Sequence, residues 1–255
     1  MAHGEEATGL GGKVALVTGG RRGLGRAMAL GLARAGARLA VSALSPDAGG
    51  LGPAVEALDS ELFYLPCDLA KRDERGTLVD AVVEHYGQID ILVNCAGAQF
   101  RQPALEFDLE QWDMLISLML SAVFELSQDA ARVMMAQGGG KIINIASLLS
   151  FQGGWTVPAY TAAKHGVAGL TRALANEWAA HNINVNAIAP GYFDTEMCAA
   201  LKADPVRGPE ILARIPAGRW GDPEDLVGPL LFLAGEASRY VHGHVLVVDG
   251  GWLGR

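Results

Sequence analysis

The chain has 255 residues, half of them apolar and 19% charged, and its 28 acidic and 20 basic side chains give a net charge of -8 at pH 7. This composition excludes an intrinsically disordered chain, and the lack of a Lys/Arg cluster argues against a nucleic-acid-binding surface. No uninterrupted apolar run approaches the roughly 18 residues of a membrane span, and the first residues lack the apolar segment of a signal peptide. The three cysteines form no metal-binding or redox spacing. We expect a cytoplasmic protein that binds a small molecule rather than nucleic acid, membrane or metal.

Short β-rich runs alternate with longer helical patterns from one end of the chain to the other. The runs are almost continuously apolar, as in Val245-Leu-Val-Val248, which is typical of parallel strands covered on both faces. We predict a single α/β domain over residues 1–255, a Rossmann fold whose seven-stranded parallel sheet is doubly wound with helices on both faces. In chain order, the predicted strands lie at 14–17, 39–41, 62–65, 89–93, 141–145, 183–185 and 245–248, and a first long helix lies at about 23–35.

The alternation breaks between residues 190 and 221. This stretch contains four prolines and follows directly on a predicted strand. A long irregular insert at a strand end is more often functional than accidental. We therefore predict that residues 190–221 form a flap over a substrate site.

A glycine-rich turn, Thr18-Gly-Gly-Arg-Arg-Gly-Leu-Gly25, joins the first predicted strand to the first predicted helix. Gly19 permits the tight turn, Gly23 lets a pyrophosphate approach the backbone, and Gly25 lets the helix pack closely on the strand. The N-terminus of the helix offers free N–H groups to phosphate. The turn indicates a dinucleotide site, although such a turn alone is also compatible with no function.

The segment Asn94-Cys-Ala-Gly97 ends the fourth predicted strand. Ligands of open parallel sheets bind beyond the carboxyl ends of the strands, at the switch point beside the first strand. Small residues there let a ring or a ribose lie against the backbone, but the same residues also suit a simple tight exit from the strand.

Ser147, Tyr160 and Lys164 form a candidate catalytic set. Ser147 follows the fifth predicted strand, and the other two lie four residues apart on a predicted helix, where they share one face. A free phenol has a pKa of about 10, which a neighbouring ammonium and an oxidised nicotinamide together would lower. Tyr160 is the predicted general acid/base, and Ser147 is the predicted hydrogen-bond partner of the substrate oxygen.

Together with Pro190-Gly191, these motifs resemble the short-chain dehydrogenase/reductase family over essentially the whole chain. The resemblance implies hydride transfer between a nicotinamide dinucleotide and a carbinol or carbonyl carbon. It implies that Lys164 binds the ribose and lowers the pKa of Tyr160, and that Asp68 and Thr195 contact the adenine and the carboxamide. The expected cofactor-binding residues are Gly19, Arg21, Arg22, Gly23, Leu24, Gly25, Ala43, Asp68, Leu69, Asn94, Ala96, Gly97, Tyr160, Lys164, Pro190, Gly191 and Thr195.

Two residues depart from the family pattern. Met119 stands where the family usually has an Asn that holds a water in a proton relay to the Lys, and a thioether cannot donate a hydrogen bond. Either water reaches Lys164 by another route or turnover is slow. Cys95 also stands where Asn is usual, and we interpret it as a buried structural thiol.

From about residue 140 onward the chain resembles one branch of the family, the dehydrogenases of 2-dehydro-3-deoxy-gluconate and of gluconate. The segment Arg214-Ile-Pro-Ala-Gly-Arg-Trp-Gly221 is one of those that carry this resemblance. A sugar acid needs a cation for its carboxylate, for which Arg101 is the first candidate and Arg214 or Arg219 the next. The other predicted substrate contacts are Leu149, Gln152, Trp155 and Tyr192.

The choice of cofactor is open between NAD and NADP. The position that carries an acid in NAD-preferring members is Ala43, followed by Leu44. No carboxylate there would repel a 2′-phosphate, and Arg21 or Arg22 could bind one, which favours NADP. The resemblance to the gluconate branch favours NAD.

Two other functions are compatible with the sequence. The same chemistry could act on another carbonyl, such as a 3-oxoacyl thioester. Met119 also suggests a dinucleotide-binding sensor with weak catalysis, although a pure binder needs no Tyr160 acid/base. Small residues on the Tyr160 helix, together with the family resemblance, predict a homotetramer.

Overall fold

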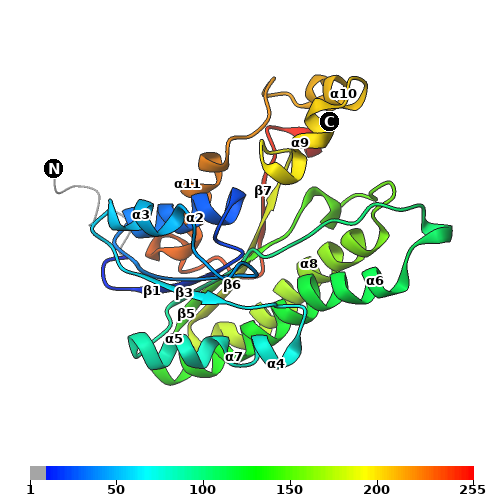
Figure 1. The fold of residues 1–255 in the computed structure, drawn as a ribbon. Helices are drawn as coiled ribbons and strands as arrows, with labels where there is room; N and C mark the ends of the chain where they lie inside the picture. Colours follow the sequence, from blue (N-terminus) through cyan, green and yellow to red (C-terminus); the bar gives the residue numbers. More distant parts are fainter. Residues whose placement is uncertain (1–9) are drawn as a thin grey trace.

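The computed structural model describes residues 10–255, so the first nine residues of the predicted domain lie outside the described part. It contains a seven-stranded sheet in the order β3-β2-β1-β4-β5-β6-β7, with parallel pairing throughout (Figure 1). The prediction of a doubly wound Rossmann sheet is confirmed. The strands are β1 (Val14–Thr18), β2 (Arg38–Ala43), β3 (Leu62–Pro66), β4 (Ile91–Asn94), β5 (Gly140–Ile145), β6 (Ile183–Pro190) and β7 (Val245–Val248). The α-helices are α2 (Gly23–Arg34), α3 (Leu51–Glu56), α4 (Arg72–Arg75), α5 (Leu78–Tyr86), α6 (Leu109–Ile116), α7 (Ala122–Gln137), α8 (Pro158–Trp178), α9 (Glu196–Ala203), α10 (Arg207–Arg214) and α11 (Val227–Ala234).

The strand order reverses at β1, which pairs with β2 on one side and with β4 on the other. The connections that follow β1 and β4 therefore leave the sheet in opposite directions. This is the switch point beyond which an open parallel sheet binds its ligands. The glycine-rich turn follows β1 and the Asn94–Gly97 segment follows β4, so both predicted cofactor segments meet there.

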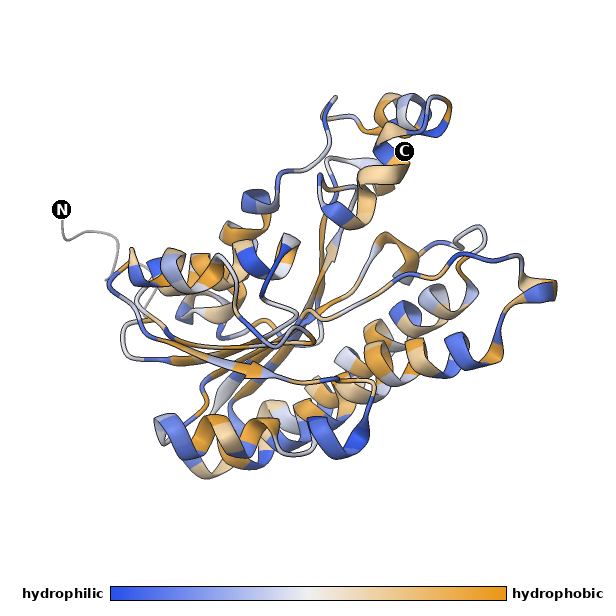
Figure 2. Ribbon diagram, viewed as in Figure 1, coloured by the Kyte–Doolittle hydropathy of each residue, from blue (hydrophilic) through white to orange (hydrophobic). Residues whose placement is uncertain are grey.

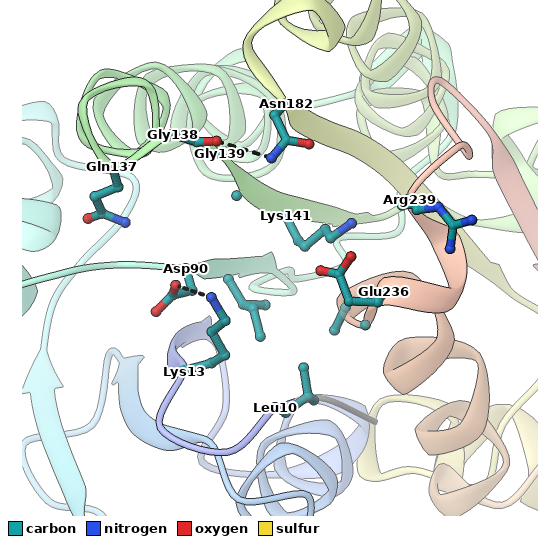
Figure 3. A pocket seen from close by; sticks show the side chains of 14 residues that line it. Leu10, Lys13, Asp90, Gln137, Gly138, Gly139, Lys141, Asn182, Glu236 and Arg239 are labelled. Carbon is teal, nitrogen blue, oxygen red and sulfur yellow. Dashed lines mark hydrogen bonds and ion pairs between the residues drawn. The ribbon is translucent and has the colours of Figure 1, made fainter. Parts of the chain in front are cut away.

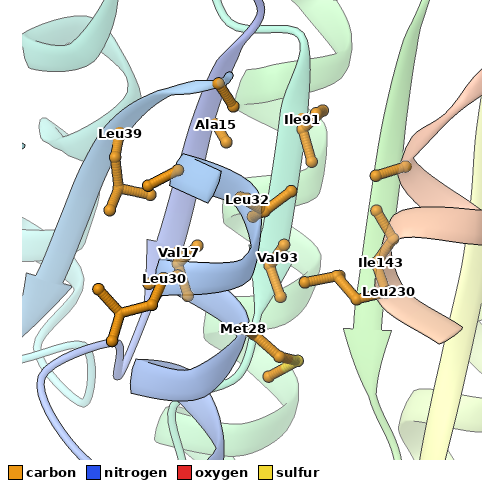
Figure 4. Packing of buried hydrophobic residues seen from close by; sticks show 14 of the residues in the cluster. Ala15, Val17, Met28, Leu30, Leu32, Leu39, Ile91, Val93, Ile143 and Leu230 are labelled. Atoms are coloured by element: carbon orange, nitrogen blue, oxygen red, sulfur yellow. The ribbon is translucent and has the colours of Figure 1, made fainter. Parts of the chain in front are cut away.

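Helices cover both faces of the sheet (Figure 1). Helices α2 and α11 pack on one face, where Met28, Leu32 and Leu230 contact strand residues such as Val17 and Ile143 (Figure 4). Helices α5, α7 and α8 pack on the other face over a second hydrophobic cluster. The strands are the most continuously apolar part of the ribbon, as expected for strands buried from both sides (Figure 2).

The predicted strand limits differ from the observed ones at two places. The fourth strand begins at Ile91 rather than at residue 89. The Asp90 carboxylate just before it accepts hydrogen bonds from Lys13 and from the backbone N–H of Val14 and so ties this segment to the start of β1. The sixth strand continues to Pro190 rather than ending at residue 185, because β7 pairs with its second half as far as Pro190.

Helix α6, a π-helical turn (Ser117–Ser121) and α7 together form one long helical stretch, Leu109–Gln137. By length and composition this stretch could cross a membrane, although it contains no uninterrupted apolar run of that length. Of its most apolar window, 44% is buried inside the molecule. Leu126, Ala130 and Met134 lie in the hydrophobic cluster beneath the sheet, so the stretch is a core helix of the fold.

The segment after β6 leaves the sheet and forms α9 and α10, which stand beyond the carboxyl ends of the strands (Figure 1). Its apolar residues pack around Trp252, in a cluster with Leu148, Ile211 and Ile215. This arrangement puts residues 190–221 over the edge of the sheet where the predicted flap would lie.

Candidate active site

The glycine-rich turn requires its glycines for space and for backbone conformation. Gly19 and Gly23 have φ angles of 67° and 55°, in the left-handed region that favours glycine. A Cβ on Gly19 would lie 2.8 Å from the Cα of Ala96, and one on Gly25 would lie 2.3 Å from the carbonyl oxygen of Gly19. The turn, the start of α2 and the segment after β4 therefore approach each other as closely as backbones can.

The N-terminus of α2 is open to an anion. Arg22 is the N-cap residue, no side chain caps the helix, and its first turn contains no acidic residue. The orphan N–H groups and the positive end of the helix dipole are thus free to bind a phosphate. The residues present fit the pyrophosphate of NAD or NADP.

Thr18 ties the two cofactor segments together, a role that the sequence reasoning missed. Its hydroxyl oxygen accepts hydrogen bonds from the backbone N–H groups of Cys95 (3.0 Å) and Ala96 (3.2 Å). The feature of the sequence that could have indicated this role is a hydroxyl side chain at the end of the first strand, next to the glycine-rich turn. Thr18 sets the position of the Asn94–Gly97 segment against the turn.

The side chain of Asn94 points into the interior. Its amide nitrogen donates to Ser127 at 3.1 Å and to Asn144 at 2.9 Å, and its buried carbonyl oxygen has no partner among the described residues. The amide joins β4 to β5 and α7, and the contacts of Asn94, Ala96 and Gly97 with a cofactor stay predictions.

The candidate catalytic residues meet at the carboxyl end of β5. Pro158 lies in the first turn of α8, where a backbone N–H would have no partner within the helix, so a proline fits there without losing a hydrogen bond. The same helix contains both Tyr160 and Lys164. The Lys164 ammonium lies 5.6 Å from the centroid of the Tyr160 ring and donates to the carbonyl oxygen of Ile145 at 2.6 Å. Ser147 follows β5 and caps the short helix after it by accepting from the N–H of Leu149. The structure thus brings the three predicted residues together.

The described residues by themselves raise the pKa of the phenol, as expected if Lys164 alone is too weak to lower it. Burial raises the pKa of Tyr160 to about 12, while the hydroxyl of Ser147 opposes this rise by favouring the phenolate. Burial also lowers the pKa of Lys164 to about 8, and the neighbouring Cys95 opposes that shift. Any lowering of the phenol pKa toward neutrality therefore needs a further positive charge in the site, such as an oxidised nicotinamide.

Met119 lies at the centre of the π-helical turn and is fully buried. It packs with Leu115, Ala159 and Ala163, and its sulfur lies 3.6 Å from the place that a Cβ on Gly97 would take. The thioether therefore fills an apolar space between the long helix, α8 and the segment after β4.

We expect Met119→Asn to lower the stability of the protein by about 1–3 kcal/mol, because the amide would enter an apolar cluster without a hydrogen-bond partner. Urea unfolding followed by circular dichroism measures the loss, and turnover of the same variant is measured in parallel. A variant that is as stable as the natural chain and turns over faster would contradict the packing role.

The other predicted cofactor residues lie along the same edge. Thr195 precedes α9, and its methyl group lies 3.9 Å from the place that a Cβ on Gly23 would take. Asp68 follows β3 and accepts from the N–H of Ala70, and Leu69 is buried. Gly191 follows β6 and donates to the carbonyl oxygen of Val248. Their contacts with a dinucleotide stay predictions.

Around the predicted substrate pocket, aromatic side chains from three segments pack together. The Tyr192 ring lies 4.7 Å from Trp252 and 5.6 Å from Trp220, measured between centroids. Trp252 is buried and donates to Gln152 at 3.0 Å, so it packs rather than offering a face to a sugar. Trp155 is 77% exposed and can still offer one.

The candidate arginines divide into two groups. Arg219 forms a two-pronged ion pair with Asp225, at 2.6 and 3.0 Å, so its guanidinium is already occupied. Arg101 and Arg214 form no ion pair with any carboxylate within residues 10–255, and neither does Arg207, which the sequence reasoning did not propose as a substrate contact. Arg214 lies 4.0 Å from the Trp252 ring centroid and Arg207 6.0 Å from that of Trp155.

A cavity at the opposite edge of the sheet is lined by several charged side chains, of which Lys13, Asp90 and Lys141 bind other residues of the chain (Figure 3). Lys13 pairs with Asp90 at 2.9 Å, and Lys141 donates to Asn184 at 2.8 Å. None of the predicted site residues lines it. Among residues 10–255 no group of three His, Cys, Asp or Glu side chains is placed to hold a metal ion.

Comparisons with known proteins identify the family. A family model described as enoyl-(acyl carrier protein) reductase matches residues 19–253. The 2-dehydro-3-deoxy-D-gluconate 5-dehydrogenase of Escherichia coli is 55% identical over 246 residues, which cover 96% of each chain. A crystal structure from Agrobacterium tumefaciens with bound NADP, provisionally assigned as a 2-deoxy-D-gluconate 3-dehydrogenase, superposes with a TM-score of 0.91, at 48% identity and covering 96% of this chain and 98% of that one. A gluconate 5-dehydrogenase from Burkholderia cenocepacia, solved with NADP and tartrate, gives a TM-score of 0.92 at 38% identity, covering 96% of this chain and 97% of that one.

Proposed function

Because the chain belongs to the short-chain dehydrogenase/reductase family, it is an NAD(P)-dependent oxidoreductase, and we propose that its substrate is a keto- or deoxy-aldonate, a sugar acid of the gluconate type. A bound NAD or NADP supplies or accepts the hydride. The chain's own residues hold the substrate and move one proton. The names of the relatives support this substrate class, and the charges around the pocket support it independently.

In the proposed reduction, Tyr160 donates its phenol proton to the substrate oxygen as that oxygen gains negative charge. The raised pKa of Tyr160 keeps the phenol protonated near neutral pH, which suits a proton donor. Ser147 donates a hydrogen bond to the same oxygen and holds it in place. Lys164 is buried and donates a hydrogen bond to the carbonyl oxygen of Ile145, which holds its ammonium group near the Tyr160 ring.

The observation that carries the substrate class is the set of arginines around Tyr192. Arg214 lies 4.0 Å from the centroid of Trp252, whose ring packs on Tyr192 at 4.7 Å. Burial raises the pKa of Tyr192, and the positive charges of Arg207, Arg101 and Arg214 oppose that rise, so all three lie near enough to act on its hydroxyl. The positive charge of Arg101 also opposes the rise in the pKa of Tyr160. In a chain with a net charge of -8, three guanidiniums that act on one tyrosine and form no ion pair within residues 10–255 favour an anionic substrate.

The test of this function is an initial-rate assay of absorbance at 340 nm, with NADH and NADPH in separate reactions for the keto substrates and with NAD+ and NADP+ for the 5-hydroxyl of 2-dehydro-3-deoxy-gluconate. The panel contains 5-keto-gluconate, 2-dehydro-3-deoxy-gluconate, its 2,5-diketo partner and a 3-oxoacyl thioester. We expect turnover of sugar acids only. Turnover of the thioester alone would transfer the proposal to that substrate class, and dinucleotide binding without any turnover would support the sensor.

We expect Arg101→Gln to raise the KM for the sugar acid about 10- to 100-fold and to change kcat much less, because a charge-assisted contact to a carboxylate contributes about 1.5–3 kcal/mol. Arg239→Gln is the matched control, since Arg239 lines the cavity at the far edge of the sheet. Steady-state kinetics of both variants measures the difference. An unchanged KM in Arg101→Gln would remove Arg101 from the substrate site.

We further propose that the protein is cytoplasmic and assembles as a homotetramer. Cys67, Cys95 and Cys198 are all free thiols, as in a reducing compartment. Phe124 on α7 and Phe232 on α11 are each 41% exposed, and such apolar side chains suit contact with another subunit. Light scattering coupled to size-exclusion chromatography is expected to give about four times the chain mass of 26.8 kDa, and a mass of one chain would refute the assembly.

A further inference from the structure

The two neighbouring arginines of the glycine-rich turn are each held by a carboxylate from another part of the chain. Arg21 donates to the carbonyl oxygen of Asp47 at 2.8 Å and to its carboxylate at 3.2 Å, in the loop after β2. Arg22 donates at 2.8 Å to Glu196, the first residue of α9 in the segment after β6. Both cations that could bind a 2′-phosphate are therefore occupied by internal anions.

The two pairs differ in how firmly they are held. The Arg21 side chain is 34% exposed, and the Asp47 carboxylate that it contacts also accepts from the N–H of Gly49, so this pair is part of the loop structure. The Arg22 and Glu196 side chains are 73% and 72% exposed and share a single contact. An exposed pair of this kind is weak and can exchange partners. Arg22 is therefore the arginine that is free to move.

The end of β2 offers no competing group. Ala43 and the 74% exposed Leu44 stand where a carboxylate would accept a hydrogen bond from a ribose 2′-hydroxyl and repel a 2′-phosphate. Selection between NAD and NADP must then come from elsewhere in the chain. A 2′-phosphate carries up to two negative charges, more than the one charge of Glu196, so it can compete for Arg22.

We propose that Glu196 is a specificity-determining residue for the cofactor. Its carboxylate occupies Arg22 and so weakens the binding of NADPH, whereas NADH binds without disturbing the pair. The 2′-phosphate takes Arg22 from Glu196 and releases the start of α9 from the glycine-rich turn. The choice of dinucleotide is thereby linked to the position of the helix that lies over the active site.

The test is the equilibrium Kd of NADPH and of NADH, measured by cofactor fluorescence without substrate, so its result does not depend on the proposed sugar-acid specificity. Glu196→Gln is expected to lower the Kd of NADPH about fivefold and to change the Kd of NADH less than about twofold. Glu210→Gln is the matched control, because it removes the same charge from α10 and forms no ion pair with a described residue. We expect it to leave the ratio of the two Kd values unchanged.

A double-mutant cycle tests whether Glu196 acts on NADPH binding through Arg22. Arg22→Gln is expected to weaken NADPH, and adding Glu196→Gln to that background is expected to have no further effect on NADPH. If Glu196→Gln tightens NADPH equally with and without Arg22, or tightens both dinucleotides alike, only net charge is acting and the proposal is wrong. If Asp47→Asn changes the ratio and Glu196→Gln does not, the proposal is likewise wrong and the role belongs to Asp47.

Discussion

Replacing Tyr160 by Phe is expected to lower kcat about a thousandfold, which is the usual contribution of a positioned general acid/base. The phenol lies beside Ser147 and is protonated near neutral pH, so its loss removes the proton donor of the reduction. The ring itself stays, and with it the packing of α8 against the long helix. Steady-state reduction of a sugar acid measures the loss, and fluorescence measures an unchanged Kd for the dinucleotide.

The control is Tyr240→Phe, which removes the same hydroxyl from a side chain that is 96% exposed. We expect no change in kcat from this variant. Full activity in Tyr160→Phe would refute the assignment of the acid/base.

The two directions of the reaction should respond differently to pH. Because the pKa of Tyr160 is raised to about 12 by burial, the phenol is protonated at pH 7 and is ready to donate in the reduction. Oxidation begins with the phenolate, so its rate should rise as the pH rises, up to the pKa that Tyr160 has in the loaded enzyme. A pH profile in both directions measures this, and an oxidation rate that falls between pH 7 and 9 would contradict it.

The sequence predicted the fold because the strands are short, nearly all apolar and separated by helical patterns. It also brought together Ser147, Tyr160 and Lys164, because strand ends and helical spacing are local properties of a sequence. What it missed are contacts between distant positions. Arg22 and Glu196 are 174 residues apart, and nothing in the pattern near either residue indicates the other.

Backbone partners are equally invisible in a sequence. Lys164 donates to the backbone carbonyl oxygen of Ile145, and because every residue has such an oxygen, the residue type at position 145 does not indicate this contact. Thr18 acts through the N–H groups of Cys95 and Ala96 in the same way. The expected lowering of the Tyr160 pKa required Lys164 and a nicotinamide together, and the size of the opposing effect of burial became visible only in the structure.

The ion pair between Arg75 and Glu125 is the second place where one substitution should have a large effect, in this case on the stability of the protein. Arg75 is 3% exposed and donates to both carboxylate oxygens of Glu125, at 2.7 and 2.9 Å. It also donates to the carbonyl oxygen of Leu69 and to the hydroxyl of Ser117 in the π-helical turn. One guanidinium therefore joins the segment after β3, which carries Asp68, to the long helix.

We expect Glu125→Gln to destabilise the protein by about 3 kcal/mol at pH 7, because it leaves the Arg75 guanidinium buried without a full counter-charge. Glu224→Gln is the matched control: it breaks an equally two-pronged pair with Arg34, at 2.8 and 3.1 Å, whose side chains are about half exposed. That loss should stay below about 1 kcal/mol. Urea unfolding of the three proteins measures the difference, and equal losses in the two variants would show that burial does not strengthen the Arg75 pair.

The pH dependence of the same measurement gives a second test. Hydrogen bonds from Arg75, and to a smaller extent from the exposed Arg72, lower the pKa of Glu125 from its ordinary value of 4.5 to about 2. A carboxyl whose pKa is lowered by folding stabilises the native state fully above its ordinary pKa, and this contribution is lost as the pH falls toward the folded value. The natural chain should therefore lose stability between about pH 4.5 and 2 faster than Glu125→Gln does, and the gap between the two proteins should narrow as the acid is added. A gap that stays constant over this range would mean that Glu125 titrates normally and that its pairs with Arg75 and Arg72 do not stabilise its charge.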